Sequence, residues 1–257
     1  MNFEVCGRGE PLLLISDLAM DRTLWSIQVP ALSPILMTVA FDNRGTGKTD
    51  SPDSSMSIEV MARDALGLME VIGLEQAHVM GLGMGGRIAM QMALDRPSRI
   101  LSLILCSTAP KATPFERHLL QAVLASLRGG MGQRDLARFE VPWLQSERYF
   151  VDPRVGEALA GVRMSRLRGT SREAHDRHIQ AHLANDLTPR LPTLSVPTLV
   201  VGGKRDILVP LAYQEEMASA FPDAELLKLD AAHMVNSEAP MEFNSGVMSF
   251  LSRRSAR

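Results

Sequence analysis

Apolar and polar positions follow two rhythms along this chain, one typical of buried strands and one typical of amphipathic helices. A continuous apolar run occurs at 12–15, and short, mostly apolar stretches occur at 77–82 and 196–201. Runs of this length predict strands that are covered on both faces. Between the first two runs, residues 57–72 place apolar side chains at steps of three and four, which predicts a helix. Strands that alternate with helices indicate an α/β fold with a parallel sheet.

The same alternation predicts most of the remaining elements. The expected strands lie at 2–6, 12–15, 35–41, 77–82, 99–106, 196–201 and 225–229. The expected helices include 57–72, 84–95, 211–220 and 239–252, and 21–28 is expected to be a short helix or turn. Residues 111–190 break the rhythm, because they contain helical stretches such as 115–128 and 172–184 and no convincing strand. We therefore expect a core formed by 1–110 and 191–257, with 111–190 as a helical cap. Sheets of this kind bind ligands at the carboxyl ends of their strands, beneath such a cap.

Composition narrows the classes of function. The 257 residues suit a single α/β unit, and 27 basic against 29 acidic residues give a net charge of -2. The arginine-rich stretch 163–177 is broken by acids, so we interpret it as a solvated helix face and expect neither nucleic acid nor a membrane surface as a partner. No apolar run reaches the ~18 residues of a membrane span, and the first residues lack a signal-peptide core. Cys6 and Cys106 are expected to be reduced, and the protein to be cytoplasmic.

The most informative stretch is 79–90, which reads as a buried strand, a glycine turn and a helix. Its glycines also fit the dinucleotide pattern G-x-G-x-x-G, but that pattern needs an acid at the end of the next strand, and 105–107 contains none. The tripeptide 47–49 resembles the end of a phosphate-binding loop. The glycine that such a loop needs five residues earlier is Asp42, so this interpretation is rejected.

The order of elements and loops resembles the α/β-hydrolase family over nearly the whole chain. Five stretches carry the resemblance: 9–15 followed by Trp25, the polar loop 41–50, the glycine turn 81–86, the loop 200–210 with Asp206, and the loop 230–240 with His233. The small capped members, such as enol-lactonases, methyl esterases and C–C bond hydrolases, are most similar. The resemblance implies a mostly parallel sheet with helices on both faces and a helical cap.

The family has a serine nucleophile at the centre of the turn, in the pattern G-x-S-x-G, and this chain has Gly83 there. The resemblance implies that His233 acts as a base and that Asp206 orients it. It also implies that the backbone N–H groups of Met84 and Leu18 stabilise a developing oxyanion. The chain therefore contains the expected acid, base and donors without the expected nucleophile.

A second departure lies in the loop after the opening strand. The family has His-Gly where this chain has Ser16-Asp17. An acid beside the N–H donors disfavours negative charge there, unless it is turned away or protonated. Asp17 is therefore a candidate pocket residue with an open role. Trp25 and Trp143 are further pocket candidates, although Trp25 is equally explained as a loop anchor and Trp143 as packing within the cap.

Two histidines of the cap raise the question of a metal. His178 and His182 lie four residues apart, a spacing that suits metal ligands on a helix. No carboxylate motif accompanies them, so we interpret them as part of an exposed or cap-lining face. We expect neither a metal nor a cofactor.

Three hypotheses explain Gly83. In the first, the protein is an enzyme in which the His233–Asp206 dyad acts on a water or on the substrate itself, for ester or lactone hydrolysis or for lyase-type and C–C chemistry. In the second, the fold is retained to bind a small molecule or a partner without catalysis. In the third, an esterase has been inactivated by replacement of its serine. We favour the first, with a small carbonyl compound as substrate; the sequence leaves open whether the chain forms a homodimer.

Overall fold

The computed structural model describes residues 1–50 and 56–254. Its centre is a seven-stranded sheet with the order β1-β3-β2-β4-β5-β6-β7. The edge strand β1 is antiparallel to β3, and the other neighbouring pairs are parallel. The strands are β1 (Phe3–Cys6), β2 (Glu10–Ile15), β3 (Leu36–Phe41), β4 (Ala77–Leu82), β5 (Ile100–Cys106), β6 (Thr198–Gly203) and β7 (Ala224–Leu229).

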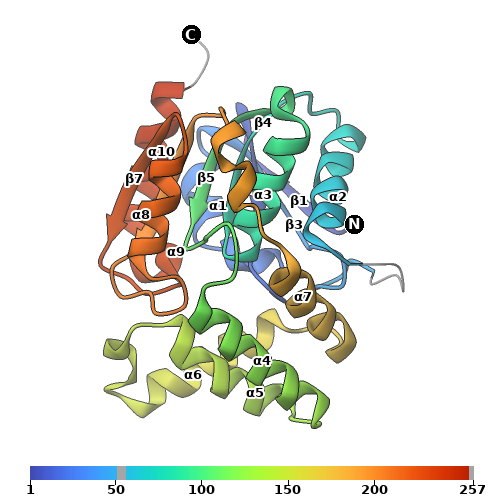
Figure 1. Ribbon diagram of the computed structural model, residues 1–257, viewed down its shortest axis with the longest axis vertical. Helices are drawn as coiled ribbons and strands as arrows, with labels where there is room; N and C mark the ends of the chain where they lie inside the picture. The colour runs from blue at the N-terminus through green and yellow to red at the C-terminus, as the bar shows by residue number, and fades with distance from the viewer. Residues whose placement is uncertain (51–55, 255–257) are drawn as a thin grey trace.

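Helices connect these strands and cover both faces of the sheet (Figure 1). They are α1 (Gln28–Leu32), α2 (Ile58–Val71), α3 (Met84–Asp95), α4 (Pro114–Arg128), α5 (Gln133–Leu144), α6 (Pro153–Arg166), α7 (Arg172–Ala184), α8 (Leu211–Ala220), α9 (Val235–Glu238) and α10 (Pro240–Arg254). Short 3-10 helices lie at Arg22–Trp25, Pro97–Arg99, Glu147–Phe150 and Thr188–Thr193. The predicted α/β class and the mostly parallel sheet are confirmed.

The two faces of the sheet are separated by the alternation of side chains along each strand. In β2, Leu13 and Ile15 join the apolar cluster that contains buried side chains of α2, α3 and α8. Leu12 and Leu14 join the opposite cluster, with side chains of α1 and α10. All four leucine and isoleucine side chains are fully buried, as expected for a strand with helices on both faces.

The amphipathic helix expected at 57–72 is α2, and its ends follow local signals. The Ser57 hydroxyl caps the start by accepting a hydrogen bond from the Val60 N–H. Gly73 follows the helix with a φ of +74°, a conformation that favours glycine. Strand β2 begins at Glu10, earlier than expected, because Glu10 pairs with Leu36 of β3.

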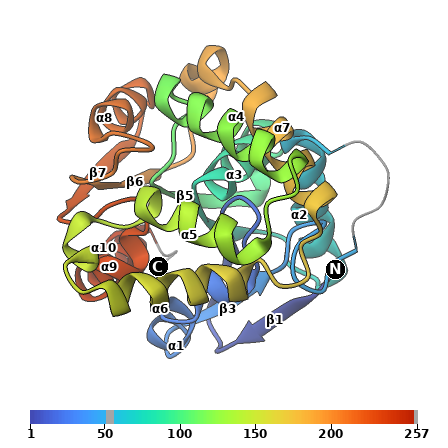
Figure 2. The ribbon, with the colours of Figure 1, turned by 90° about the horizontal axis from the view of Figure 1, so that it is seen from below.

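The residues expected to form a cap contain α4, α5, α6 and α7, all between β5 and β6 in the chain. These helices lie at one end of the sheet in Figure 1, and the view from below in Figure 2 shows α4, α5 and α6 crossing that end. The cap is tied to the core at the start of α4, where the Thr113 hydroxyl donates a 2.8 Å hydrogen bond to the Leu208 carbonyl.

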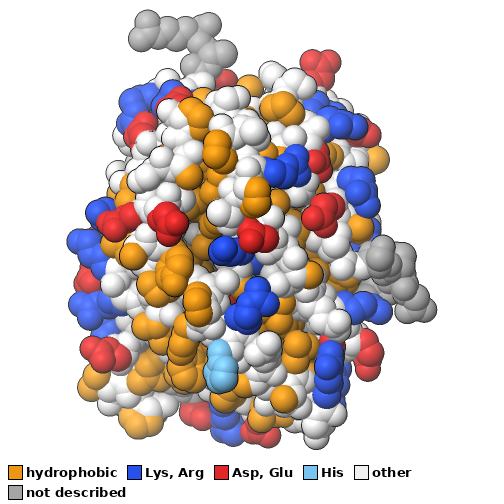
Figure 3. Space-filling view, viewed as in Figure 1, with side chains coloured by type: hydrophobic (Ala, Val, Ile, Leu, Met, Phe, Trp, Pro, Cys, Tyr) orange, Lys and Arg blue, Asp and Glu red, His pale blue; other side chains and the backbone are white. Residues whose placement is uncertain are grey.

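The surface of the described chain mixes charge and apolar side chains. Acidic and basic groups are interspersed on the face drawn in Figure 3, and hydrophobic side chains gather towards its lower part, over the cap helices of Figure 1. None of the helices within residues 1–50 and 56–254 is both long and apolar enough to cross a membrane.

Candidate active site

The glycine turn between β4 and α3 is tight because the backbones around it approach closely. A Cβ atom on Gly81 would lie 2.2 Å from the Gly85 carbonyl oxygen, and one on Gly85 would lie 2.2 Å from the Ile15 oxygen. Gly83 has a φ of +53° and a ψ of -116°, a conformation that side chains rarely tolerate. The turn therefore has the strained form of a nucleophile elbow, with no side chain at its centre.

The loops after β6 and β7 bring Asp206 and His233 together. The His233 Nδ1 atom lies 3.0 Å from Asp206 Oδ2. The other carboxylate oxygen of Asp206 accepts hydrogen bonds of 2.9 and 3.0 Å from the N–H groups of Leu208 and Val209. Asp206 is thus fixed as an acceptor, so Nδ1 carries a proton and Nε2 of His233 faces the rest of the site.

Asp17 occupies the space of the missing nucleophile. A Cβ atom on Gly83 would lie only 2.0 Å from Asp17 Oδ1 and 2.4 Å from its Cγ. Oδ1 accepts a 2.8 Å hydrogen bond from the Met84 N–H, the donor expected to stabilise an oxyanion. Oδ2 lies 3.4 Å from His233 Nε2. The carboxylate is therefore not turned away from the donors.

The charges of this group reinforce one another. Burial raises the pKa of Asp17, but His233 and the N–H groups of Met84 and Leu18 outweigh burial and lower that pKa below its usual value. Burial lowers the pKa of His233, but the carboxylates of Asp206 and Asp17 outweigh burial and raise it well above its usual value. The resting site is thus an imidazolium between two carboxylates, and Asp17 is ionised.

The loop that carries Asp17 is fixed by the cap. Ala19 has a φ of +51°, and its N–H donates a 3.2 Å hydrogen bond to Nδ1 of His178 on α7. The Nε2 atom of His178 lies 2.9 Å from the Arg44 carbonyl oxygen, to which it donates. Burial lowers the pKa of His178 to about 4, so the ring is neutral and uses one nitrogen as acceptor and one as donor. His178 positions the loop.

His182 has a different partner. Its Nε2 atom lies 2.6 Å from Glu116, which also forms a buried ion pair with Arg87. Within residues 1–50 and 56–254, no group of three or more histidine, cysteine, aspartate or glutamate side chains is placed to hold a metal ion.

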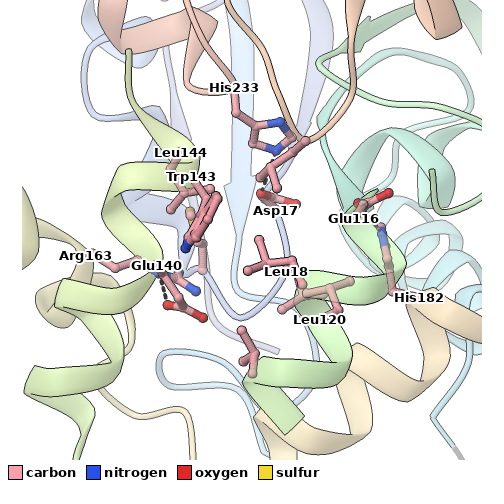
Figure 4. Close-up of a pocket in the computed structure, with 14 residues that line it drawn as sticks. Asp17, Leu18, Glu116, Leu120, Glu140, Trp143, Leu144, Arg163, His182 and His233 are labelled. Carbon is pink, nitrogen blue, oxygen red and sulfur yellow. Dashed lines mark hydrogen bonds and ion pairs between the residues drawn. The ribbon is translucent and has the colours of Figure 1, made fainter. Parts of the chain in front are cut away.

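A pocket opens between this group and the cap (Figure 4). Its empty space of about 520 Å³ includes open solvent at its mouth. Asp17, Leu18 and His233 line it from the core, and Trp143 of α5 lines it from the cap. The Trp143 ring packs 5.7 Å from the Phe115 ring, and its buried N–H has no hydrogen-bond partner.

Two side chains of the cap add charge to the far part of the pocket. Glu140 of α5 accepts a 2.8 Å hydrogen bond from Nε of Arg163 on α6, and both residues are buried. The interpretation of 163–177 as a solvated face is therefore wrong at its first residue. The sequence contains no signal that selects Arg163 from the neighbouring arginines, because its burial depends on packing between α5 and α6.

The pocket assignment of Trp25 is corrected. Its side chain is fully buried in the apolar cluster between the sheet and α10, and it does not line the pocket. The alternative interpretation, a loop anchor, fits this position. Cys106 is completely buried, and burial raises the pKa of its thiol far above the usual value, so the thiol stays protonated and does not serve as a nucleophile.

The sequence of this chain matches the model of the alpha/beta hydrolase fold family over residues 10–240. The chain belongs to the α/β-hydrolase family. It is 33% identical to "Putative carbamate hydrolase RutD" of Rhizobium rhizogenes, over 99% of both chains. It is also 24% identical to 3-oxoadipate enol-lactonase 2 of Acinetobacter baylyi, over 98% of this chain and 93% of that protein.

Solved structures of the family have the same fold. The enol-lactonase from Burkholderia xenovorans LB400 superimposes with a TM-score of 0.89 at 28% identity, covering 98% of this chain and 96% of the other. An esterase from Thermogutta terrifontis superimposes with a TM-score of 0.86 at 29% identity, covering 99% of this chain and 94% of the other. These relatives support an activity of the α/β-hydrolase type.

Proposed function

We propose that this protein hydrolyses a small carbonyl compound, such as an ester, a lactone or a carbamate, without a serine nucleophile. The names of the relatives, a carbamate hydrolase and enol-lactonases, support this class of substrate. The observation that carries the proposal is the position of His233, which lines a pocket and lies between two carboxylates. A histidine in this arrangement can move a proton to and from a bound substrate.

The raised pKa of His233 sets the order of its proton transfers. Because the ring is an imidazolium at rest, it can protonate the leaving group as a nucleophile forms the new bond to the acyl carbon and the bond to the leaving group breaks. The neutral ring that results then takes a proton from water, and Asp206 stabilises the imidazolium that forms again. In this proposal His233 acts as an acid before it acts as a base.

Hydrolysis of a small panel tests this proposal: p-nitrophenyl acetate, dihydrocoumarin and a phenyl carbamate. We expect turnover of at least one of them, and we expect His233→Gln to lower kcat by about 100-fold or more. His118→Gln is the matched control, because His118 is an exposed histidine of α4 that does not line the pocket. Equal turnover by the His233→Gln variant and the unaltered protein would contradict the proposal.

One observation favours a second candidate, a binding protein without catalysis. The Met84 N–H already bonds to Asp17, so this donor does not receive an oxyanion of the substrate unless Asp17 moves. A binding protein would bind a panel compound without converting it, and His233→Gln would change its affinity alone. The third hypothesis, an esterase whose serine was simply removed, fits poorly, because a side chain at residue 83 collides with Asp17.

A further inference from the structure

We propose that Asp17 is the covalent nucleophile of this site and attacks the substrate in place of the missing serine. The inference rests on the proposed function, because it specifies how the carbonyl compound is hydrolysed. Its first support is position: the Asp17 carboxylate overlaps the space of a side chain at residue 83 and lines the pocket. A carboxylate from the loop after β2 therefore reaches the place that a side chain on the elbow reaches in the family.

The two oxygens of Asp17 have different surroundings. Oδ1 accepts the 2.8 Å hydrogen bond from the Met84 N–H, and the Leu18 N–H is also a hydrogen-bond donor to the carboxylate. Oδ2 lies 3.4 Å from Nε2 of His233. One oxygen is thus fixed in the donor site, and the other lies beside the proton donor, where a leaving group has to be protonated.

The reaction is balanced with these groups alone. Asp17 Oδ2 attacks the acyl carbon, the bond from that carbon to the leaving group breaks, and the leaving group takes the proton of His233. The product of this step is a mixed anhydride between Asp17 and the acyl group. Neutral His233 then takes a proton from water, and the water oxygen attacks Cγ of Asp17. Collapse releases the acid with the former Asp17 oxygen, and one proton leaves to solvent.

The N–H donors fit the second step of this route. In that step negative charge develops on Asp17 Oδ1, which already accepts the hydrogen bond from the Met84 N–H. The first step lacks these donors, since Asp17 fills their site. This asymmetry favours activated acyl compounds, whose enol or phenol leaving groups depart easily once they are protonated.

The other carboxylates that line the pocket have different partners. Glu116 is engaged by His182 and by Arg87, and Glu140 is engaged by Arg163. Among the pocket-lining carboxylates of the described chain, Asp17 is the one in contact with His233. Glu116 and Glu140 therefore serve as internal controls for the reactivity of Asp17.

Turnover in heavy-oxygen water tests the route directly. With p-nitrophenyl acetate, we expect the Asp17-containing peptide to gain heavy oxygen and the acetate of the first turnover to contain none. A route through water alone gives the opposite result, with heavy oxygen in the acetate and none in Asp17, and would overturn the inference. Asp17→Asn, which keeps the shape of the side chain, is expected to lower kcat by more than about 100-fold.

A second measurement does not depend on finding a substrate. Phenyl glycidyl ether alkylates carboxylates, and the opened ring oxygen takes a proton from water. In the His233→Gln variant, which cannot activate water to remove the ester, we expect one label per chain on Asp17. Asp17→Asn should carry no such label, and its melting curve verifies that it is folded. Labelling that spares Asp17, or that favours Glu116 and Glu140, would overturn the inference.

The two proposals fail in different ways. Absence of turnover with the whole panel counts against the proposed function, while the epoxide label still decides whether Asp17 is nucleophilic. Turnover that survives Asp17→Asn and leaves no heavy oxygen in Asp17 counts against the nucleophile alone. The proposed function then stands with water, in place of Asp17, as the nucleophile.

Discussion

A serine introduced at residue 83 tests whether Asp17 occupies the space of a nucleophile. The experiment compares four proteins: the unaltered chain, Gly83→Ser, Asp17→Gly and the double variant. A Cβ atom at residue 83 would lie 2.0 Å from Asp17 Oδ1, so the single variant Gly83→Ser has to push the carboxylate out of its site. In the double variant the obstructing carboxylate is absent, and the site approaches the arrangement of a serine hydrolase with His233 and Asp206.

The contacts of Gly83 and Asp17 indicate how strongly Gly83→Ser should destabilise the protein. A side chain in the backbone conformation of Gly83 costs on the order of 1–3 kcal/mol. Expulsion of Asp17 breaks its charged hydrogen bond with the Met84 N–H, which costs roughly 1.5–3 kcal/mol. Gly83→Ser should therefore be destabilised by about 2.5–6 kcal/mol. The hydrogen bond is lost in both single variants but only once in the double variant, so the substitutions should couple by roughly 1.5–3 kcal/mol.

Urea unfolding of the four proteins measures this coupling. The effects of the two substitutions would add to within about 0.5 kcal/mol if the side chains did not share a space, and that result would refute the reasoning. The double variant should also hydrolyse p-nitrophenyl acetate and be labelled at residue 83 by a serine-directed phosphonate. Gly83→Ser alone should react much less, because the displaced carboxylate stays near its hydroxyl.

Two further predictions concern pH and the cap. A serine hydrolase needs a neutral histidine, so its activity rises with pH through the histidine pKa. In this protein His233 must be protonated in the first step. We therefore expect kcat to stay level through the usual histidine range and to fall as pH rises through the raised pKa of His233. A pH–kcat profile that rises near neutrality would contradict this order. Arg163→Met removes the arginine partner of the buried Glu140 and should lower the free energy of unfolding in urea by about 3–5 kcal/mol, while Arg163→Met with Glu140→Leu should recover most of the loss.

The spacing of apolar and polar residues along the chain was enough to predict most of the fold. Residues 12–15 of β2 are buried on both faces of the sheet, so they appear in the sequence as an unbroken apolar run. The α2 helix has one buried face and clear signals at both ends. Asp206 and His233 follow strands directly, and the carboxyl ends of parallel strands lie along one edge, so their meeting also follows from order along the chain.

The placements that could not be predicted depend on the direction of single side chains. Trp25 was a pocket candidate because it follows the opening strand, yet its ring lies on the α10 side of the sheet. Arg163 resembles the other arginines of its stretch until α5 and α6 are packed together. The spacing of nearby residues does not predict either side-chain position, because each depends on the surface of the element that packs beside it.

The placement of Asp17, unlike those of Trp25 and Arg163, is indicated in the sequence by two separate departures from the family pattern. Gly83 lacks the side chain that the family has there, and Asp17 adds a carboxylate, at positions 66 residues apart in the chain. Taken by itself, each departure indicates a hydrolase site that has lost activity. In space they are complementary: the side chain gained at one position fills the volume left at the other. A site that had simply lost its function would need no such compensation. The ion pair with His233 and the hydrogen bond from Met84 connect the new carboxylate to the acid, the base and the donors that remain. The two departures are therefore one rearrangement, in which the reactive group enters from a different loop.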